Sequence, residues 1–179
     1  MKQIEEWIRL FEDKPRCREW VSHPENLHQS WEVEPLGAGT TALHVACHLD
    51  LSDVVLQLLA HGAGAREKNA VGQLAIHLAC CRKAGGDRTV GHLLAYQSPL
   101  NLQDEAGRTA LHEAAEQGNL PLVRLLLDQE ANPLILTKAG KTPMDLAEGE
   151  VKEVIRAKTL EILDRDEFPT AGRMWGLRE

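Results

Sequence analysis

Aromatic residues are scarce in this chain and make up 4% of its 179 residues. A core with so few aromatic rings must be built from small and aliphatic side chains, as in short helices that stack closely. The hydrophobic fraction of 43% and the charged fraction of 26% are ordinary for a folded protein. The composition therefore excludes a chain that is disordered throughout.

An excess of positive charge and a long apolar run are also missing. The formal net charge is -7 and no basic run occurs, whereas affinity for nucleic acid comes from Lys and Arg that neutralise phosphates. No stretch approaches the roughly 20 apolar residues of a membrane-spanning helix. The N-terminal segment carries acids where a signal peptide has its apolar core. We expect a cytoplasmic protein with neither a nucleic-acid nor a membrane partner.

A motif of eight residues occurs four times, and its leading glycines are 33, 35 and 33 residues apart. The four copies are GTTALHVA (39–46), GQLAIHLA (72–79), GRTALHEA (107–114) and GKTPMDLA (140–147). A period of about 33 residues with the pattern T-P-L-H-x-A resembles the ankyrin-repeat family. The resemblance covers roughly residues 36–163 and implies an all-α solenoid of about four helix-turn-helix repeats with helical caps at both ends.

Apolar residues at helical spacing follow each of the first three motifs, at 54–59, 90–94 and 122–127. Each unit is therefore predicted to be helix, turn, helix and loop. Gly118 and Asp50 occupy the turn between the helices, where a left-handed backbone suits both residue types. Gly62 follows the second helix of the first unit, as a glycine that ends a helix should.

The period divides the chain into six segments. They are an N-terminal helical cap or degenerate repeat (1–36), three repeats (37–69, 70–104 and 105–137), a shortened last repeat (138–166) and a tail (167–179). The two extra residues of the second repeat fall within 81–88 and should lengthen the turn between its helices. The last repeat lacks residues at the same place, so we expect a truncated first helix and a final helix from about Glu150 to Asp166.

Six of the seven aromatic residues lie outside the stacked helices. Ile4, Trp7, Ile8 and Phe11 form an i, i+3, i+4, i+7 stripe on a predicted N-terminal helix. We interpret this stripe as a lid over the first repeat, because terminal repeats need a cap. Residues 14–35 have no clear period, and the pattern leaves open whether they are a degenerate repeat or a loop.

Three histidines, His44, His77 and His112, recur once per repeat. The family resemblance implies that this histidine hydrogen-bonds within and between the turns that link repeats. Equivalent residues in stacked helices are about 8–10 Å apart, too far to share one zinc ion. His44 and His48 have the i, i+4 spacing of a metal site, so a metal-dependent hydrolase remains a remote alternative, but the glutamate of a zinc-protease motif is missing. We expect no metal, no cofactor and no enzymatic activity.

The four cysteines do not predict a disulfide framework. Cys47 and Cys80 occupy equivalent positions in adjacent helices, where their Cα atoms should lie beyond the roughly 7 Å limit for a disulfide. Cys17 and Cys81 have no evident partner. A reducing compartment suits this placement.

Solenoids bind through their concave surface. In ankyrin-repeat proteins, which this chain resembles, the hairpin tips and the first helices make that surface. The residues predicted to face a partner are Thr40, His48, Leu49, Val71, Gln73, Cys81, Arg82, Glu105, Arg108, Glu116, Gln117, Lys138 and Lys141. Arg82 and Arg108 are the preferred polar anchors among them, because Arg is enriched at interfaces.

The predicted function is that of a protein-protein interaction module, an adaptor, regulator or inhibitor that is a monomer when free. The repeats and their caps account for nearly the whole chain, which leaves no further domain to carry chemistry. The alternatives are an immunity-type inhibitor of a cognate toxin or enzyme, and a secreted effector directed at a host. The sequence identifies no partner.

Overall fold

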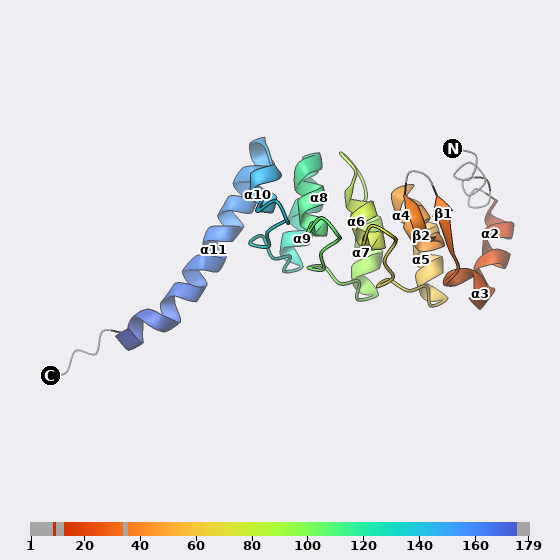
Figure 1. The fold of residues 1–179 in the computed structure, drawn as a ribbon, viewed down its shortest axis with the longest axis horizontal. Helices are drawn as coiled ribbons and strands as arrows, with labels where there is room; N and C mark the ends of the chain where they lie inside the picture. Colours follow the sequence, from red (N-terminus) through yellow and green to blue (C-terminus); the bar gives the residue numbers. More distant parts are fainter. Residues whose placement is uncertain (1–8, 10–12, 34–35, 175–179) are drawn as a thin grey trace.

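The computed structural model describes residues 9, 13–33 and 36–174. Two short helices and a strand come first: α2 (Lys14–Val21), α3 (Pro24–Leu27) and β1 (Ser30–Val33). The repeats follow as β2 (Gly37–Thr41), α4 (Ala42–His48), α5 (Ser52–Ala60), α6 (Ala75–Cys80), α7 (Asp87–Ala95), α8 (Ala110–Gln117), α9 (Leu120–Asp128), α10 (Pro143–Leu146) and α11 (Gly149–Met174). Figure 1 shows these elements in chain order along one elongated molecule.

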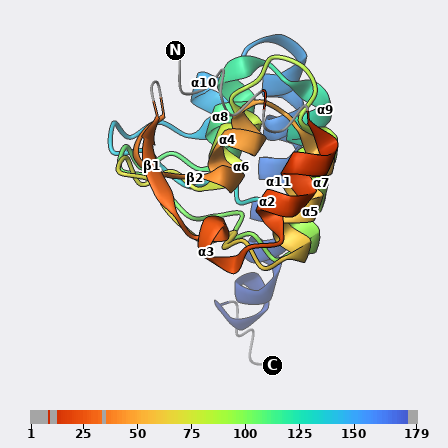
Figure 2. The same ribbon diagram turned by 90° about the vertical axis from the view of Figure 1, so that its right-hand side faces the viewer.

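The helices stack in two rows. In the first row α4 packs on α6, α6 on α8 and α8 on α10, while in the second α5 packs on α7, α7 on α9 and α9 on α11. The connecting loops project together on one side of the stack, as the view along its axis shows (Figure 2). The predicted all-α solenoid of helix pairs is therefore confirmed.

Small residues allow the first row to pack closely. Ala42, Ala75 and Ala110 are the first residues of α4, α6 and α8, and each is 1% exposed or less. Bulkier Leu43, Ile76 and Leu111 come next in each helix and are equally buried. Because the same small-large pair recurs in the first three repeats, neighbouring helices meet through similar surfaces, and a core with few aromatic rings can be continuous.

The turns between paired helices follow the sequence expectations. Asp50 (φ 58°) and Gly118 (φ 70°) both adopt the left-handed conformation. In the second repeat α6 ends at Cys80 and α7 starts only at Asp87. The expected lengthening of this turn is thus confirmed, and Gly85 and Gly86 in it have positive φ angles.

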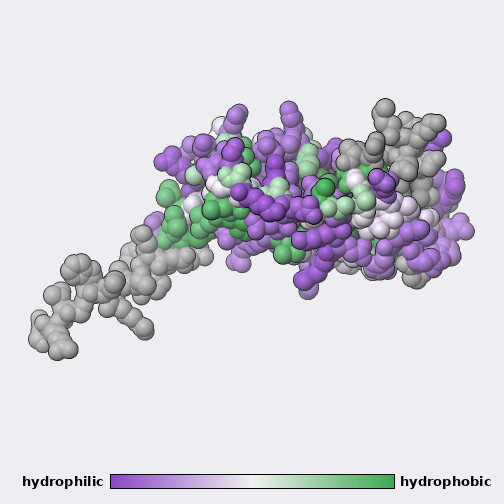
Figure 3. Space-filling view, viewed as in Figure 1, coloured by the Kyte–Doolittle hydropathy of each residue, from purple (hydrophilic) through white to green (hydrophobic). Residues whose placement is uncertain are grey.

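The last repeat has the predicted short first helix, α10, of four residues. The predicted end of the final helix was wrong, because α11 continues past Asp166 to Met174. Arg and Glu are good helix formers, so the charge run that includes Asp166 does not end the helix. Apolar side chains gather near this end of the molecule (Figure 3), where Leu160 and Leu163 are exposed.

The N-terminal cap contains a β-hairpin that the sequence analysis did not predict. β1 pairs antiparallel with β2, and Trp31 lies opposite Thr40. Trp31 also contacts Trp20 of α2, with ring centroids 6.2 Å apart. Residues 30–33 do alternate polar and apolar side chains, but four residues are the shortest run at which alternation indicates a strand. Residues 14–33 are thus neither a repeat nor a plain loop, and the predicted lid residues Ile4, Trp7, Ile8 and Phe11 lie outside the described residues.

Candidate partner-binding surface

Backbone hydrogen bonds tie each hairpin tip to the next. The N–H groups of Ala70, Glu105 and Lys138 donate to the carbonyls of Ala38, Val71 and Ala106, at 2.8, 3.1 and 2.9 Å. Gly107 shows how close the tips are, because a Cβ atom there would lie 2.7 Å from the nitrogen of Lys138. The side chains on the tips are therefore carried by a continuous ladder with little freedom to move.

The recurring histidines join the first helices to the same ladder. Nδ1 of His44 accepts the N–H of Thr41 at 3.2 Å, so the ring proton lies on Nε2, which donates to the carbonyl of Gln73 in the next repeat at 3.1 Å. His77 and His112 make equivalent bonds to the carbonyls of Arg108 and Lys141, both at 3.2 Å. The structural role implied by the family resemblance is confirmed.

These histidines are held neutral. His44, His77 and His112 are each fully buried, and burial lowers the pKa of all three imidazoles. Asp145 takes the place of histidine in the last repeat and accepts the N–H of Thr142 at 2.8 Å. The hydrogen bonds of its short side chain join it to Thr142 of the same repeat, so the bridges between repeats end here.

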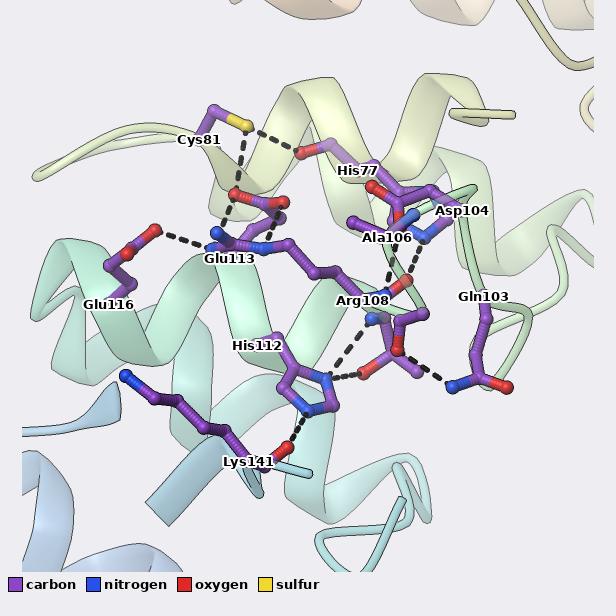
Figure 4. A network of polar contacts seen from close by, with 12 residues as sticks. His77, Cys81, Gln103, Asp104, Ala106, Arg108, His112, Glu113, Glu116 and Lys141 are labelled. Carbon is purple, nitrogen blue, oxygen red and sulfur yellow. Dashed lines mark hydrogen bonds and ion pairs between the residues drawn. The ribbon is translucent and has the colours of Figure 1, made fainter. Parts of the chain in front are cut away.

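The third repeat carries a closed polar network, drawn in Figure 4. Arg108 Nε lies 2.8 Å from Oε1 of Glu113, and its Nη2 donates to Oε2 of Glu116. The side chains of Arg108 and Glu113 are 23% and 8% exposed. Burial raises the pKa of the Glu113 carboxyl, and the charge of Arg108 partly offsets that rise. Arg108 is thus already engaged by two carboxylates of its own repeat.

Cys81 joins this network from the second repeat. Its Sγ donates to Oε2 of Glu113 at 3.4 Å and to the carbonyl of His77 at 3.2 Å. Burial and the neighbouring Glu113 carboxylate raise the pKa of the Cys81 thiol to about 12. The thiol is therefore protonated at neutral pH and acts as a hydrogen-bond donor, not as a nucleophile.

The first repeat offers less to a partner than expected. Thr40 was predicted to project from a tip, but it is fully buried, because β2 places it opposite Trp31 and its hydroxyl donates to the carbonyl of Gly37 at 2.7 Å. Leu49 is half-buried and packs against the core. His48 is half-buried as well, so the predicted residues of this repeat expose little side-chain surface to a partner.

The most exposed predicted residues lie on the tips of the later repeats. Val71 is 45% exposed, and Glu105, Lys138 and Lys141 are exposed as well. Glu116 is exposed next to Arg108, whereas Gln73, Arg82 and Gln117 are half-buried. We call the set of the exposed tip residues Val71, Glu105, Lys138 and Lys141 the tip surface.

The sequence analysis did not predict the side-chain contacts of three residues. Glu113 occupies the position that holds Val45 and Leu78 in the first two repeats, and a charge at a repeated apolar position was a signal available in the alignment of the motifs. Asp50 and Asn119 bind the long turn of the second repeat from either side. No sequence pattern predicts those contacts, because they join different repeats.

The geometry gives no support to a hydrolytic metal site at His44 and His48. Both ring nitrogens of His44 are engaged, Nδ1 by Thr41 and Nε2 by the carbonyl of Gln73. Among the described residues, no group of three or more His, Cys, Asp or Glu side chains is arranged to hold a metal ion. Within the same residues, no helix has the length and apolar character needed to cross a membrane.

Comparison with known families agrees with this architecture. The sequence model described as "Ankyrin repeats (3 copies)" matches residues 76–157, and the model described as "Ankyrin repeat" matches residues 38–70. The chain belongs to the ankyrin-repeat family. Ankyrin repeats are protein-protein interaction modules, and this chain is therefore one such module.

The similar proteins carry diverse names. The chain is 33% identical to human BCL-6 corepressor-like protein 1 over 111 residues, which is 62% of this chain and 6% of that protein. It is 36% identical over 110 residues to the tyrosine-protein kinase Shark of Drosophila melanogaster, or 61% of this chain and 12% of the kinase. Human NF-kappa-B inhibitor epsilon is 35% identical over 100 residues, which is 51% of this chain and 20% of that protein. The ankyrin repeats therefore match only a small part of each relative.

Proposed function

We propose that this ankyrin-repeat chain is a non-enzymatic regulator or inhibitor that binds one protein partner across the tip surface. The observation that carries the proposal is the exposure of Val71, Glu105, Lys138 and Lys141 on a hydrogen-bonded ladder. Side chains on a rigid support lose little conformational entropy when a partner binds, which favours affinity. The name of one relative, NF-kappa-B inhibitor epsilon, is in keeping with an inhibitory role.

The repeat spacing also supports a single extended interface. The roughly 10 Å between repeats places the tips of three successive repeats along about 20 Å, enough for a peptide segment or one edge of a small domain. The mixture of one apolar and several charged side chains is typical of an interface with a polar rim. The residues predicted from the sequence as partner-binding, apart from buried Thr40, remain predictions in this proposal.

A capture experiment tests the proposal. The wild type and a variant with Val71→Glu, Glu105→Lys and Lys138→Glu would each be used to capture partners from the native lysate, followed by mass spectrometry. The matched control carries Leu56→Glu, Asp128→Lys and Lys152→Glu, which make the same chemical changes at exposed positions of the second-row helices. We expect the tip variant to lose the partner and the control to keep it. Loss in the control but not in the tip variant would refute the proposed surface.

A second role, that of an adaptor within a larger assembly, is favoured by one observation. The matched segment spans between 6% and 20% of the length of the three relatives. An adaptor would capture two or more proteins that bind to separate surfaces, whereas an inhibitor, including one of the immunity type, would capture a single protein whose activity falls on binding. Assaying each captured protein with and without the chain distinguishes these outcomes.

We further propose that the free chain is a monomer in a reducing compartment such as the cytoplasm. Cys17, Cys47, Cys80 and Cys81 are all free thiols, and such thiols persist where glutathione keeps them reduced. Light scattering over a range of concentrations tests the monomer. A mass that rises with concentration would contradict it and indicate self-association.

A further inference from the structure

The long turn of the second repeat and the first residues of α7 form a distinct structure, which we call the inserted loop (residues 81–88). It rises beside α6 to the upper edge of the stack in Figure 1. Lys83, Ala84 and Gly85 in it are exposed to solvent. Insertions in repeat proteins fall in loops on one face, which is often the face that binds a partner.

Neighbouring repeats hold the inserted loop from both sides. From the first repeat, the carboxylate of Asp50 accepts the N–H of Gly86 at 3.2 Å and the hydroxyl of Thr89 at 2.6 Å. From the third repeat, Nδ2 of Asn119 donates to the carbonyls of Arg82 and Gly85, both at 3.0 Å. A loop held in this way is organised before binding, which lowers the entropy lost when a partner docks.

The loop is basic in a chain that is acidic as a whole. It contains three cations, Arg82, Lys83 and Arg88, and one acid, Asp87, whereas the net charge of the chain is -7. Lys83 and Arg88 are exposed and form no ion pair with any described residue. Arg82 is partly engaged, since its Nη1 donates to the carbonyl of His48 at 3.2 Å and its Nε lies 3.9 Å from Asp50.

The backbone of the loop is not the recognition element. The start of α7 has no side-chain cap of its own, since Gly86 occupies the N-cap, and the Asp50 carboxylate already supplies negative charge there. An external anion would have to displace it. The exposed side chains of Lys83 and Arg88 are therefore the groups left to attract negative charge from a partner.

We infer that the inserted loop docks an acidic, carboxylate-rich segment of a protein partner, with Lys83 and Arg88 as the contacting cations. The inference rests on the proposed function and adds a second contact beside the tip surface. A protein segment fits better than nucleic acid, because two or three cations on one short loop do not form the track that neutralises a run of phosphates. The negative charge of the rest of the molecule repels an acidic ligand, so any binding must be local.

The test uses a fluorescein-labelled peptide of alternating Glu and Gly, with fluorescence anisotropy at low ionic strength. The loop variant is Lys83→Glu with Arg88→Glu. The control is Lys152→Glu with Arg156→Glu, the same pair of residue types at exposed positions of α11. We expect the loop variant to bind about tenfold more weakly, because two attractions become repulsions, and the control to change by less than about twofold.

Three results would overturn the inference: no binding by the folded wild type, equal losses in both variants, or tighter binding of a single-stranded oligonucleotide through the same two residues. Circular dichroism of each variant verifies that it is folded. A failure of the proposed function can be told apart from a failure of this inference, because the capture experiment with the tip variant tests a different surface. Capture of a partner whose binding depends on the tip surface but not on the inserted loop would refute this inference and leave the proposed function standing.

Discussion

The second and third repeats place different chemistry on equivalent backbone positions. In the third, Arg108, Glu113 and Glu116 bind one another and leave few charges unpaired. In the second, the equivalent residues are Gln73, Leu78 and Cys81, and the unpaired charges lie instead on the inserted loop. One repeat therefore uses its charges for its own stability, while its neighbour leaves them available to a partner. The predictions below test this difference.

The largest effect is expected where the ladder itself is cut. His77→Ala removes the bonds to the carbonyls of Leu102 and Arg108 and leaves a cavity between the two repeats. We expect a loss of about 3 kcal/mol in the free energy of unfolding, measured in urea. Asp145→Ala, at the same position of the last repeat, should lower it much less, because Asp145 is exposed and its hydrogen bonds join it to Thr142 of its own repeat. Equal losses would contradict the account of the bridging histidines.

Arg108→Ala should cost about 2–4 kcal/mol at neutral pH, because it leaves the buried carboxylate of Glu113 without its partner. Lys141→Ala, at the equivalent exposed position of the last repeat, should change stability by less than about 0.5 kcal/mol. Adding Glu113→Leu to Arg108→Ala should recover most of the loss, since Leu78 occupies that position in the second repeat. If the double variant is as unstable as the single one, Arg108 stabilises the repeat by some other contact.

Acidification should destabilise the whole stack. Burial lowers the folded-state pKa of His44, His77 and His112, so the unfolded chain binds more protons just below its own histidine pKa, about 6.5. Their stabilising effect is complete above pH 6.5 and decreases as the pH falls from there toward the folded-state pKa values. Glu113 has a raised pKa and acts in the opposite direction, but it is one group against four histidines, since burial also lowers the pKa of His48. Urea unfolding at a series of pH values checks the sign, and a stability that is constant from pH 7 to pH 5 would contradict it.

The smallest effect on stability is expected at the inserted loop. Lys83→Ala with Arg88→Ala should leave the free energy of unfolding within about 0.5 kcal/mol of wild type, because neither side chain bonds to a described residue. The same variant should weaken binding of the acidic peptide. A large loss of stability would show that these charges serve the fold and are not free for a partner.

The sequence was informative wherever a pattern repeats. The period predicted the helix pairs, the left-handed turns at Asp50 and Gly118 and the lengthened second turn. It did not predict β1, because this strand lies outside the repeats and its polar-apolar alternation covers four residues, the shortest run that indicates a strand. Nor did it reveal that Thr40 is buried, because that burial comes from a β-hairpin partner that the repeat pattern does not contain.

The sequence predicted where the side chains of the candidate surface lie but not which contacts they make. Counting from the repeat glycines located Arg108 and Arg82 correctly near the first helices, yet gave no sign that Arg108 is bound by Glu113. Such pairing depends on side-chain geometry within the folded repeat. The clamp of Asp50 and Asn119 on the inserted loop likewise joins residues more than 30 positions apart, at separations of 36 and 34 residues from Gly86 and Gly85.

Hydrogen exchange of the chain alone and in complex with its captured partner tests the central claim most directly. The account predicts slower exchange on binding at the tips, residues 70–73, 105–108 and 138–141, and in the inserted loop, with little change in α5, α7 and α9. Protection confined to those second-row helices or to the N-terminal cap would contradict it, because the partner would then bind a surface other than the tips.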